Sequence, residues 1–80
     1  MSKISVKFRN TKAFAETFTI KDKGNNDQQV FSGNLDAGAS TGVLSISAND
    51  LGQGQVSYRY DDNDFGDSEE LNDGDTYDMF

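Results

Sequence analysis

The sequence predicts an all-β domain, a small antiparallel β-sandwich of immunoglobulin-like or Greek-key type with six to seven short strands. Several segments alternate polar and apolar residues, which is the period of a strand with one buried face. Runs rich in glycine, asparagine, aspartate and serine separate these segments about every eight to twelve residues, as turns do. The chain has 80 residues, roughly half of a typical domain, so we expect a single domain over residues 1–80.

The strand at the N-terminal end has the clearest pattern. It alternates without a break, and Ile4, Val6 and Phe8 share the face that we expect to be buried. In the second strand, Glu16 is the one charged residue on an otherwise apolar face. The last two strands are expected to pair around an Asp73-Gly74 hairpin turn. In order, the expected strands cover residues 3–9, 14–21, 29–35, 41–48, 55–60, 70–71 and 76–79.

The chain contains no cysteine and no histidine. Their absence excludes disulfides and the usual protein ligands of zinc, copper and haem. It also leaves proton transfer to carboxylates, tyrosine or lysine, and 80 residues offer little room for a substrate cleft, so we expect no enzymatic activity. Hard cations bound through oxygen, Ca²⁺ above all, are the cofactor class that remains open.

Residues 1–9 contain no continuous apolar stretch, so the sequence predicts neither a signal peptide nor membrane insertion. By default, this favours a cytoplasmic location. The absence of cysteine does not decide the compartment, because exported domains without disulfides also occur.

Negative charge is concentrated at the C-terminal end. The net charge is −7; residues 61–80 hold nine acidic residues and no basic one, whereas residues 1–23 hold six basic and two acidic residues. Such a surface repels nucleic acids and anionic membranes and attracts cations and basic proteins. We therefore expect no direct nucleic-acid binding. The basic N-terminal strands are expected to offset part of the acidic charge if they lie beside it.

Four segments together resemble the CARDB-type family of immunoglobulin-like bacterial adhesion modules. They are VKFRNT at residues 6–11, residues 16–20, LDAGAS at residues 35–40 and YDDND at residues 60–64. The resemblance lies in their order and spacing: a strand ending in Asn-Thr, a Leu-x-x-Gly-x-Ser turn, and an acidic stretch before the last strand. It implies a seven-stranded sandwich that serves as an adhesion module.

The stretch YDDNDFGDS at residues 60–68 is similar to the hairpin of βγ-crystallin domains. In that family, a six-residue Asn/Asp-Asn/Asp-x-x-Ser/Thr-Ser signature supplies calcium ligands. Residues 63–68 fit this signature except that Asp67 takes the place of serine or threonine. The resemblance implies a calcium-binding hairpin.

The acidic stretch also suggests a calcium site by its composition. Ca²⁺ takes six to eight oxygen ligands, and closely spaced carboxylates around a glycine can supply them. Our candidate metal ligands are Asp62, Asp64, Asp67 and Glu69. Their spacing is not that of an EF-hand loop, in which glycine occupies position 6, because Gly66 falls at position 5 counted from Asp62. A solvated acidic loop that only aids solubility explains the same composition.

A basic protein surface is the other partner that the composition predicts. The candidate contact residues are Asp61, Phe65, Asp73 and Asp75, and Phe65 is expected to be exposed because it lies within the acidic stretch. Clustered carboxylates also suit an acidic decoy, an inhibitor that occupies a basic groove of another protein. We thus expect a non-enzymatic binding or interaction module, monomeric or weakly dimeric. Calcium, a basic partner and a merely solvated loop all remain open.

Overall fold

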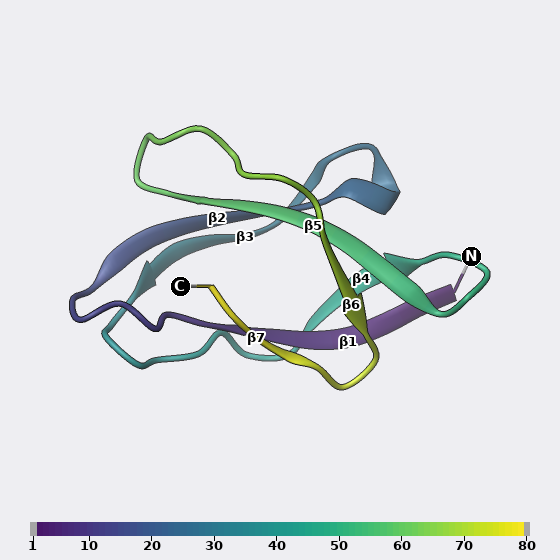
Figure 1. Ribbon diagram of the computed structural model, residues 1–80, viewed down its shortest axis with the longest axis horizontal. Coiled ribbons are helices and arrows are strands. Elements are labelled where there is room, and N and C mark those ends of the chain that lie inside the picture. The colour runs from purple at the N-terminus through teal and green to yellow at the C-terminus, as the bar shows by residue number, and fades with distance from the viewer. Residues whose placement is uncertain (1, 80) are drawn as a thin grey trace.

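Seven β-strands in two packed sheets make up the structure, a computed structural model that describes residues 2–79 (Figure 1). The strands are β1 (Ser2–Arg9), β2 (Glu16–Asp22), β3 (Gln28–Leu35), β4 (Leu44–Ala48), β5 (Gln53–Tyr60), β6 (Glu69–Asn72) and β7 (Thr76–Asp78). A three-residue 3-10 helix, η1 (Lys23–Asn25), joins β2 to β3. The predicted all-β sandwich is confirmed. The described residues form no helix long and apolar enough to cross a membrane.

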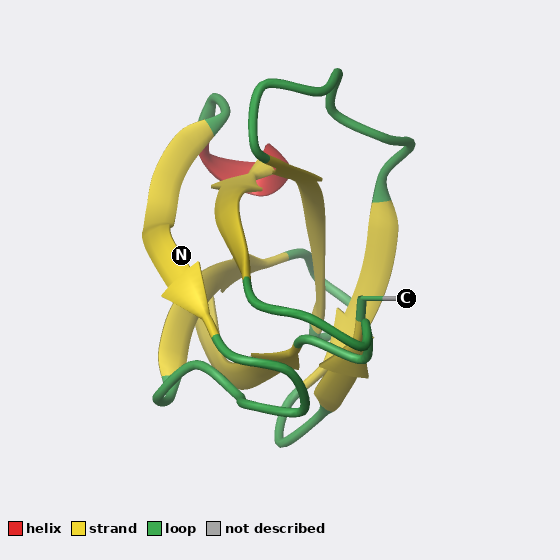
Figure 2. Cartoon of the chain, turned by 90° about the vertical axis from the view of Figure 1, so that its left-hand side faces the viewer, coloured by secondary structure: helices red, strands yellow, loops and turns green. Residues whose placement is uncertain are grey.

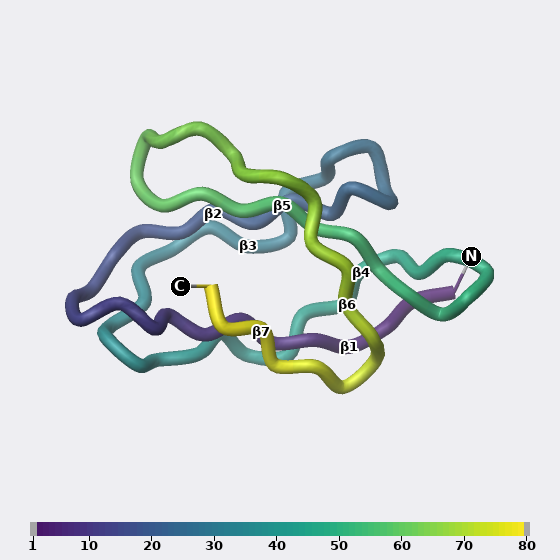
Figure 3. The backbone as a smooth tube through the Cα atoms, viewed as in Figure 1, coloured from purple at the N-terminus to yellow at the C-terminus, as the bar shows by residue number. Residues whose placement is uncertain are grey.

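The three-stranded sheet has the order β4-β1-β7. β1 pairs antiparallel with β4 through residues 2–6 and parallel with β7 through residues 7–9. Ser5 of β1 also binds the turn before β7: its N–H donates to Asp73 Oδ1, and its carbonyl oxygen accepts from Gly74 N, both at 2.8 Å. The expected hairpin between the last two strands is therefore wrong. The turn carries the chain from one sheet to the other, as the tube in Figure 3 shows.

The four-stranded sheet has the order β3-β2-β5-β6 and is antiparallel throughout. β3 forms one edge of this sheet and β6 the other. The pairing of β2 with β3 shifts register after Ile20. Phe31 lies opposite Ile20 and Gln29 lies opposite Lys21, so Val30 forms a β-bulge.

Apolar side chains from both sheets meet in a core between them. The alternation of β1 is borne out, because Ile4, Val6 and Phe8 are all buried. Tyr58 on β5 closes the core near the C-terminal end, where its hydroxyl donates to Met79 O at 2.7 Å. Burial raises the pKa of Tyr58 far above its ordinary value of 10.0. The buried apolar residues are Ile4, Val6, Phe8, Phe18, Ile20, Leu35, Ile46, Ala48, Val56, Leu71 and Met79.

Asn10 is fully buried and ties together three segments that lie apart in the sequence. Its Nδ2 donates to Phe14 O and to Leu35 O, both at 3.0 Å. Its Oδ1 accepts from Lys12 N at 2.9 Å. A buried amide without partners is costly, so these bonds hold the turn after β1 against the end of β3.

Candidate functional site

The acidic loop, residues 61–68, connects β5 to β6 and arches outside the four-stranded sheet (Figure 1). Backbone hydrogen bonds hold it at two points. Asp61 N donates to Thr17 O on β2 at 2.7 Å, and Gly66 N donates to Tyr58 O on β5 at 3.2 Å. Asp61 has a positive φ of 51°, which aspartate tolerates better than most residues. The first residue of the loop is thus bonded to β2, and Gly66, near the end of the loop, is bonded to β5.

Phe65 anchors the middle of the acidic loop to the outer face of the sheet. Lys21 Nζ on β2 lies 4.2 Å from the centroid of the Phe65 ring, and Arg59 Cζ on β5 lies 4.9 Å from it. Both cations are within the range of a favourable cation–π interaction. The ring is half-buried, so Phe65 is not the freely exposed contact that the sequence suggested.

The sheet surface around Phe65 is shielded from water. The register places Thr19 opposite Arg59 and Ser57 opposite Lys21 on the outer face of the sheet. These two hydroxyl residues are only 9% and 3% exposed. Arg59 Nε is buried, and among residues 2–79 no acceptor forms a hydrogen bond with it. A buried polar nitrogen without a hydrogen bond costs free energy. The cation–π contact between the Arg59 guanidinium and the Phe65 ring offsets part of this cost.

The carboxylates of the acidic loop remain in solvent. Asp61, Asp62, Asp64 and Asp67 are exposed, and Glu69 at the start of β6 is half-buried. Within the described part of the chain, no group of three or more acidic side chains is placed to hold a metal ion. The predicted calcium ligands Asp62, Asp64, Asp67 and Glu69 are therefore not gathered into a cluster. Together with Asp61, they present separated negative charges on a fixed backbone.

Asp73 and Asp75, two of the predicted partner contacts, shape the turn between β6 and β7. Asp73 Oδ1 accepts the Ser5 N–H of β1, and Asp75 Oδ2 accepts the Asn72 N–H at 2.8 Å. Gly74 between them has a φ of 86°, a conformation that glycine adopts without steric cost. These two carboxylates thus hold the turn through which the chain passes from one sheet to the other. Asp73 is also exposed to solvent.

A pair of carboxyl groups lies at the start of the acidic loop. The hydrogen bond that protonated Glu16 donates to Asp61 raises the pKa of Glu16 above its ordinary value of 4.5, and desolvation and the charge of Asp61 act in the same direction. The positive charge of Lys12, whose Nζ is 3.9 Å from Glu16 Oε1, acts in the opposite direction and lowers the pKa of Glu16. Lys12 Nζ also lies 3.7 Å from the centroid of the Tyr60 ring. The sequence marked Glu16 as a misfit on its strand face, but it did not indicate Asp61, Lys12 or Tyr60 as neighbours.

Of the two basic N-terminal strands, β1 lies beside β7, whereas β2 pairs with β3 and β5. Arg9 Nε is 4.0 Å from Asp78 Oδ1, and the two side chains are 51% and 60% exposed. Surface pairs of this kind contribute at most about 1 kcal/mol. A shorter ion pair, 2.8 Å between Lys23 Nζ and Asp27 Oδ1, lies within the N-terminal half of the chain. Neither pair involves the aspartates of the acidic loop.

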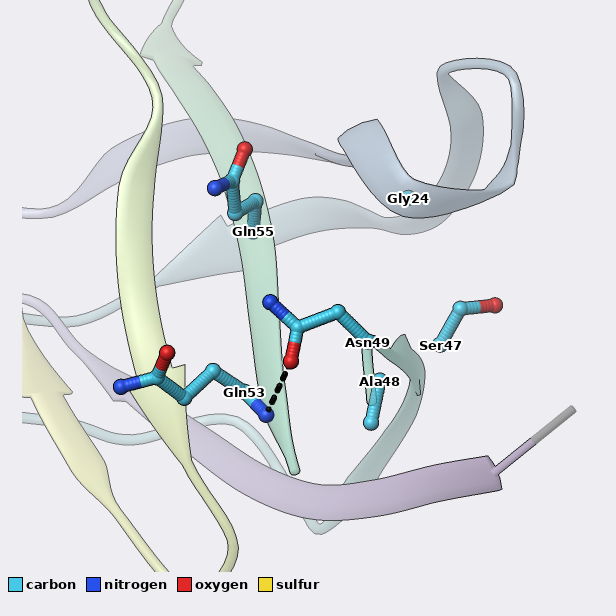
Figure 4. A pocket seen from close by; sticks show the side chains of 6 residues that line it. All are labelled: Gly24, Ser47, Ala48, Asn49, Gln53 and Gln55. Atoms are coloured by element: carbon cyan, nitrogen blue, oxygen red, sulfur yellow. Dashed lines mark hydrogen bonds between the residues drawn. The ribbon is translucent and has the colours of Figure 1, made fainter. Parts of the chain in front are cut away.

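A separate pocket of about 250 Å³ lies between η1, β4 and β5 (Figure 4). Asn49 Oδ1 accepts from Leu51 N and Gln53 N at 2.9 and 3.0 Å, so this oxygen serves the turn between the two strands. All the lining residues are uncharged, and the pocket therefore offers neutral hydrogen-bonding groups. They are Gly24, Ser47, Ala48, Asn49, Gln53 and Gln55.

Comparison of the chain with known protein families, with characterised proteins and with solved structures finds no match. Function must therefore be inferred from the sites of the molecule itself.

Proposed function

We propose that the chain is a non-enzymatic interaction module whose acidic loop binds a basic surface of a partner protein. The observation that carries this proposal is the clamp on Phe65. The ring lies over the cations of Lys21 and Arg59, while the neighbouring Asp62, Asp64 and Asp67 stay exposed. A loop that is already ordered loses less conformational entropy on binding than a free one. Its fixed, solvated charges can meet several lysine or arginine side chains at once.

The spread of the carboxylates favours a protein surface over a single cation. A calcium ion needs its oxygen ligands within about 2.3–2.6 Å, and the described carboxylates form no such group. Basic side chains of a partner are long and can reach charges that lie apart. The resemblance of the sequence to adhesion modules points in the same direction, because such modules act by contact with other molecules.

A calcium site at Asp62, Asp64, Asp67 and Glu69 is the alternative proposal. It would require the acidic loop to close around the ion. Binding would then stabilise the fold in proportion to ion concentration, beyond the effect of ionic strength alone. A thermal melt with Ca²⁺, and with a monovalent salt at equal ionic strength, separates the two proposals.

The test uses two variants with the same change in net charge. The loop variant carries Asp62→Asn, Asp64→Asn and Asp67→Asn. The control carries Asp36→Asn, Asp50→Asn and Glu70→Gln, three acidic residues that are also exposed but lie outside the loop. Each variant removes three of the 14 acidic residues and shifts the net charge from −7 to −4.

We expect a fluorescent oligolysine peptide to bind the native chain and the control, and to bind the loop variant much more weakly. Binding should weaken steeply with added salt. Equal losses in both variants would show that net charge alone attracts the peptide, and would contradict a loop-specific site. Capture of proteins from cell extract with the same three chains then identifies the natural partner.

A further inference from the structure

β3 is an edge strand without the usual protection against strand pairing. It forms one margin of the four-stranded sheet, and in Figure 2 it follows the red helix down the left side of the molecule. Its eight residues, QQVFSGNL, include no charged residue and no proline. Natural edge strands are commonly protected by charge, proline, shortness or a bulge. β3 has only the bulge at Val30, which leaves residues 31–35 as a regular segment.

The register shows which backbone groups of this segment are free. Asp61 N donates to Thr17 O, so the backbone groups of Thr17 face β5. Because alternate residues of a strand face opposite neighbours, Phe18 and Ile20 face β3. Their partners on β3 are Gly33 and Phe31, respectively.

Ser32 lies between Phe31 and Gly33, and Asn34 follows Gly33. Ser32 and Asn34 therefore direct their backbone N–H and C=O groups away from β2. Within residues 2–79, no hydrogen bond from another segment reaches these outward groups. Both residues are also exposed. The free groups of an extended strand are complementary to a second extended strand.

The other three edges are less suited to pairing. On β4, Ser47 N already donates to Asp22 Oδ2 at 2.8 Å. β6 carries Glu69 and Glu70, and β7 has only three residues and includes Asp78. For a chain with a net charge of −7, strand pairing at β6 or β7 would bring like charges together. Residues 31–35 carry no charge.

We propose that two copies of the chain pair antiparallel through residues 31–35 of β3, about a two-fold axis at Gly33. The segment Phe-Ser-Gly-Asn-Leu has the same pattern of apolar, polar and small residues in both directions, as self-pairing about a two-fold axis requires. Ser32 then lies opposite Asn34 of the second copy, and these are the residues with free backbone groups. The two four-stranded sheets become one sheet of eight strands.

Apolar contacts would support the new ladder. The ring of Phe31 lies over Gly33, where Phe31 Cζ is 3.4 Å from the position that a Cβ atom would occupy. Phe31 is half-buried at the open margin of the core. In the dimer it lies opposite Leu35 of the second copy, so part of its exposed surface is removed from water. This surface is distinct from the acidic loop, so the two proposals can fail independently.

Amide hydrogen exchange followed by NMR tests the pairing directly. We expect the amides of Ser32 and Asn34 to exchange rapidly in dilute solution and to become protected as the concentration rises from micromolar to millimolar. The amides of Phe31 and Gly33, which face β2, should be protected at every concentration. Concentration-independent exchange at Ser32 and Asn34 would overturn the proposal. Protection that appears only with cell extract would assign the edge to a foreign strand and would also overturn it.

Sedimentation of matched variants provides the second test. The average mass of the native chain should rise with concentration from 8.8 kDa toward twice that value. Asn34→Pro removes an outward N–H without removing a bond to β2, and should weaken association about tenfold or more. Asn34→Ala, and Ser45→Lys on the exposed side of β4, should associate like the native chain. A dimer that survives Asn34→Pro or is abolished by Ser45→Lys would contradict the assignment to β3.

Discussion

Asp22 on β2 joins the two sheets through a hydrogen bond from the backbone N–H of Ser47 on β4, with 2.8 Å between Ser47 N and Asp22 Oδ2. The other carboxylate oxygen, Oδ1, accepts from Gly24 N at 3.0 Å and caps η1. Asp22 is 1% exposed and the bond from Ser47 N is buried, so water cannot replace the bond between the sheets. The buried carboxylate of Asp22 thus accepts a hydrogen bond from the edge strand β4 of one sheet. It also caps η1, which follows β2 of the other sheet.

Replacing Asp22 with asparagine should destabilise the fold. The amide keeps the size of the side chain but has only one acceptor oxygen, so one of the two donors loses its partner. A buried donor left unsatisfied costs about 1–3 kcal/mol, and we expect the free energy of unfolding in urea to fall by this amount. Asp50→Asn, at an exposed position, is the control and should change it little. Equal unfolding curves for the two variants would show that the bond between the sheets contributes nothing.

Phe65→Ala should release the acidic loop from the sheet. The substitution removes the ring that lies over Lys21 and Arg59. Each cation–π interaction is worth about 0.5–1 kcal/mol, so we expect a loss of stability of about 1–2 kcal/mol and faster cleavage of the loop by a protease specific for aspartate. Phe14→Ala, at a site that is 63% exposed, should leave the cleavage rate unchanged. If cleavage of the Phe65→Ala loop is no faster, the clamp does not order it.

The carboxyl pair at Glu16 should give the stability a specific dependence on pH. The pKa of Glu16 in the folded chain lies above its ordinary value of 4.5, chiefly because protonated Glu16 donates a hydrogen bond to Asp61. The folded chain thus binds this proton more tightly than the unfolded chain does. The resulting stabilisation is fully present below pH 4.5 and is lost as the pH rises through the folded-state pKa.

Asp61→Asn removes this effect, so its melting temperature should rise relative to that of the native chain between pH 4.5 and 7. The control is Asp62→Asn, which makes the same change of charge at the next residue, also exposed. The carboxyl carbon resonance of Glu16 should titrate at a lower pH in Asp61→Asn than in the native chain. An unchanged titration midpoint would show that Asp61 does not hold the proton on Glu16.

Residue alternation was sufficient to predict the fold class, because burial on one face of a strand is a local property of the sequence. Ile4, Val6 and Phe8 illustrate this: all three are buried as the period of two indicates. The turn at Asp73-Gly74 was also predicted, and Gly74 does adopt a positive φ. The expected pairing of β6 with β7 across this turn was wrong. Ser5, which is far away in the sequence, binds the turn, and β7 pairs with β1 instead.

The candidate site was predicted as a stretch of sequence but not as an arrangement of side chains. Nothing in the spacing of residues 61–68 shows that Phe65 turns back onto the sheet, because its two cations come from β2 and β5. Glu16 was recognised as a misfit, yet its neighbour Asp61 is remote in the sequence. Such contacts depend on which strands are adjacent, and alternation within a strand carries no information about that.

Packing between the sheets is tight at Gly54 on β5, which lies against Ile46 on β4. A Cβ atom at residue 54 would be 2.5 Å from Ile46 Cδ1 and 3.0 Å from both Ile46 Cγ1 and Ser47 O. Ile46 is 0% exposed, so its side chain has little room to move aside. Added atoms in a well-packed core cost about 1–3 kcal/mol, and we expect Gly54→Ala to lower the free energy of unfolding by this amount. Gly42→Ala, where no atom lies within 4 Å of the new Cβ, is the control.

A double-mutant cycle shows whether contact with Ile46 causes the loss at Gly54. Ile46→Val removes Cδ1, the closest atom, and by itself should cost about 0.5–1.5 kcal/mol. In the double variant, the new methyl group occupies part of the space that the isoleucine vacates. The two changes should therefore destabilise the chain by less than the sum of the single effects. Strict additivity in urea unfolding would place the strain elsewhere, at Ser47 O, which Ile46→Val does not relieve.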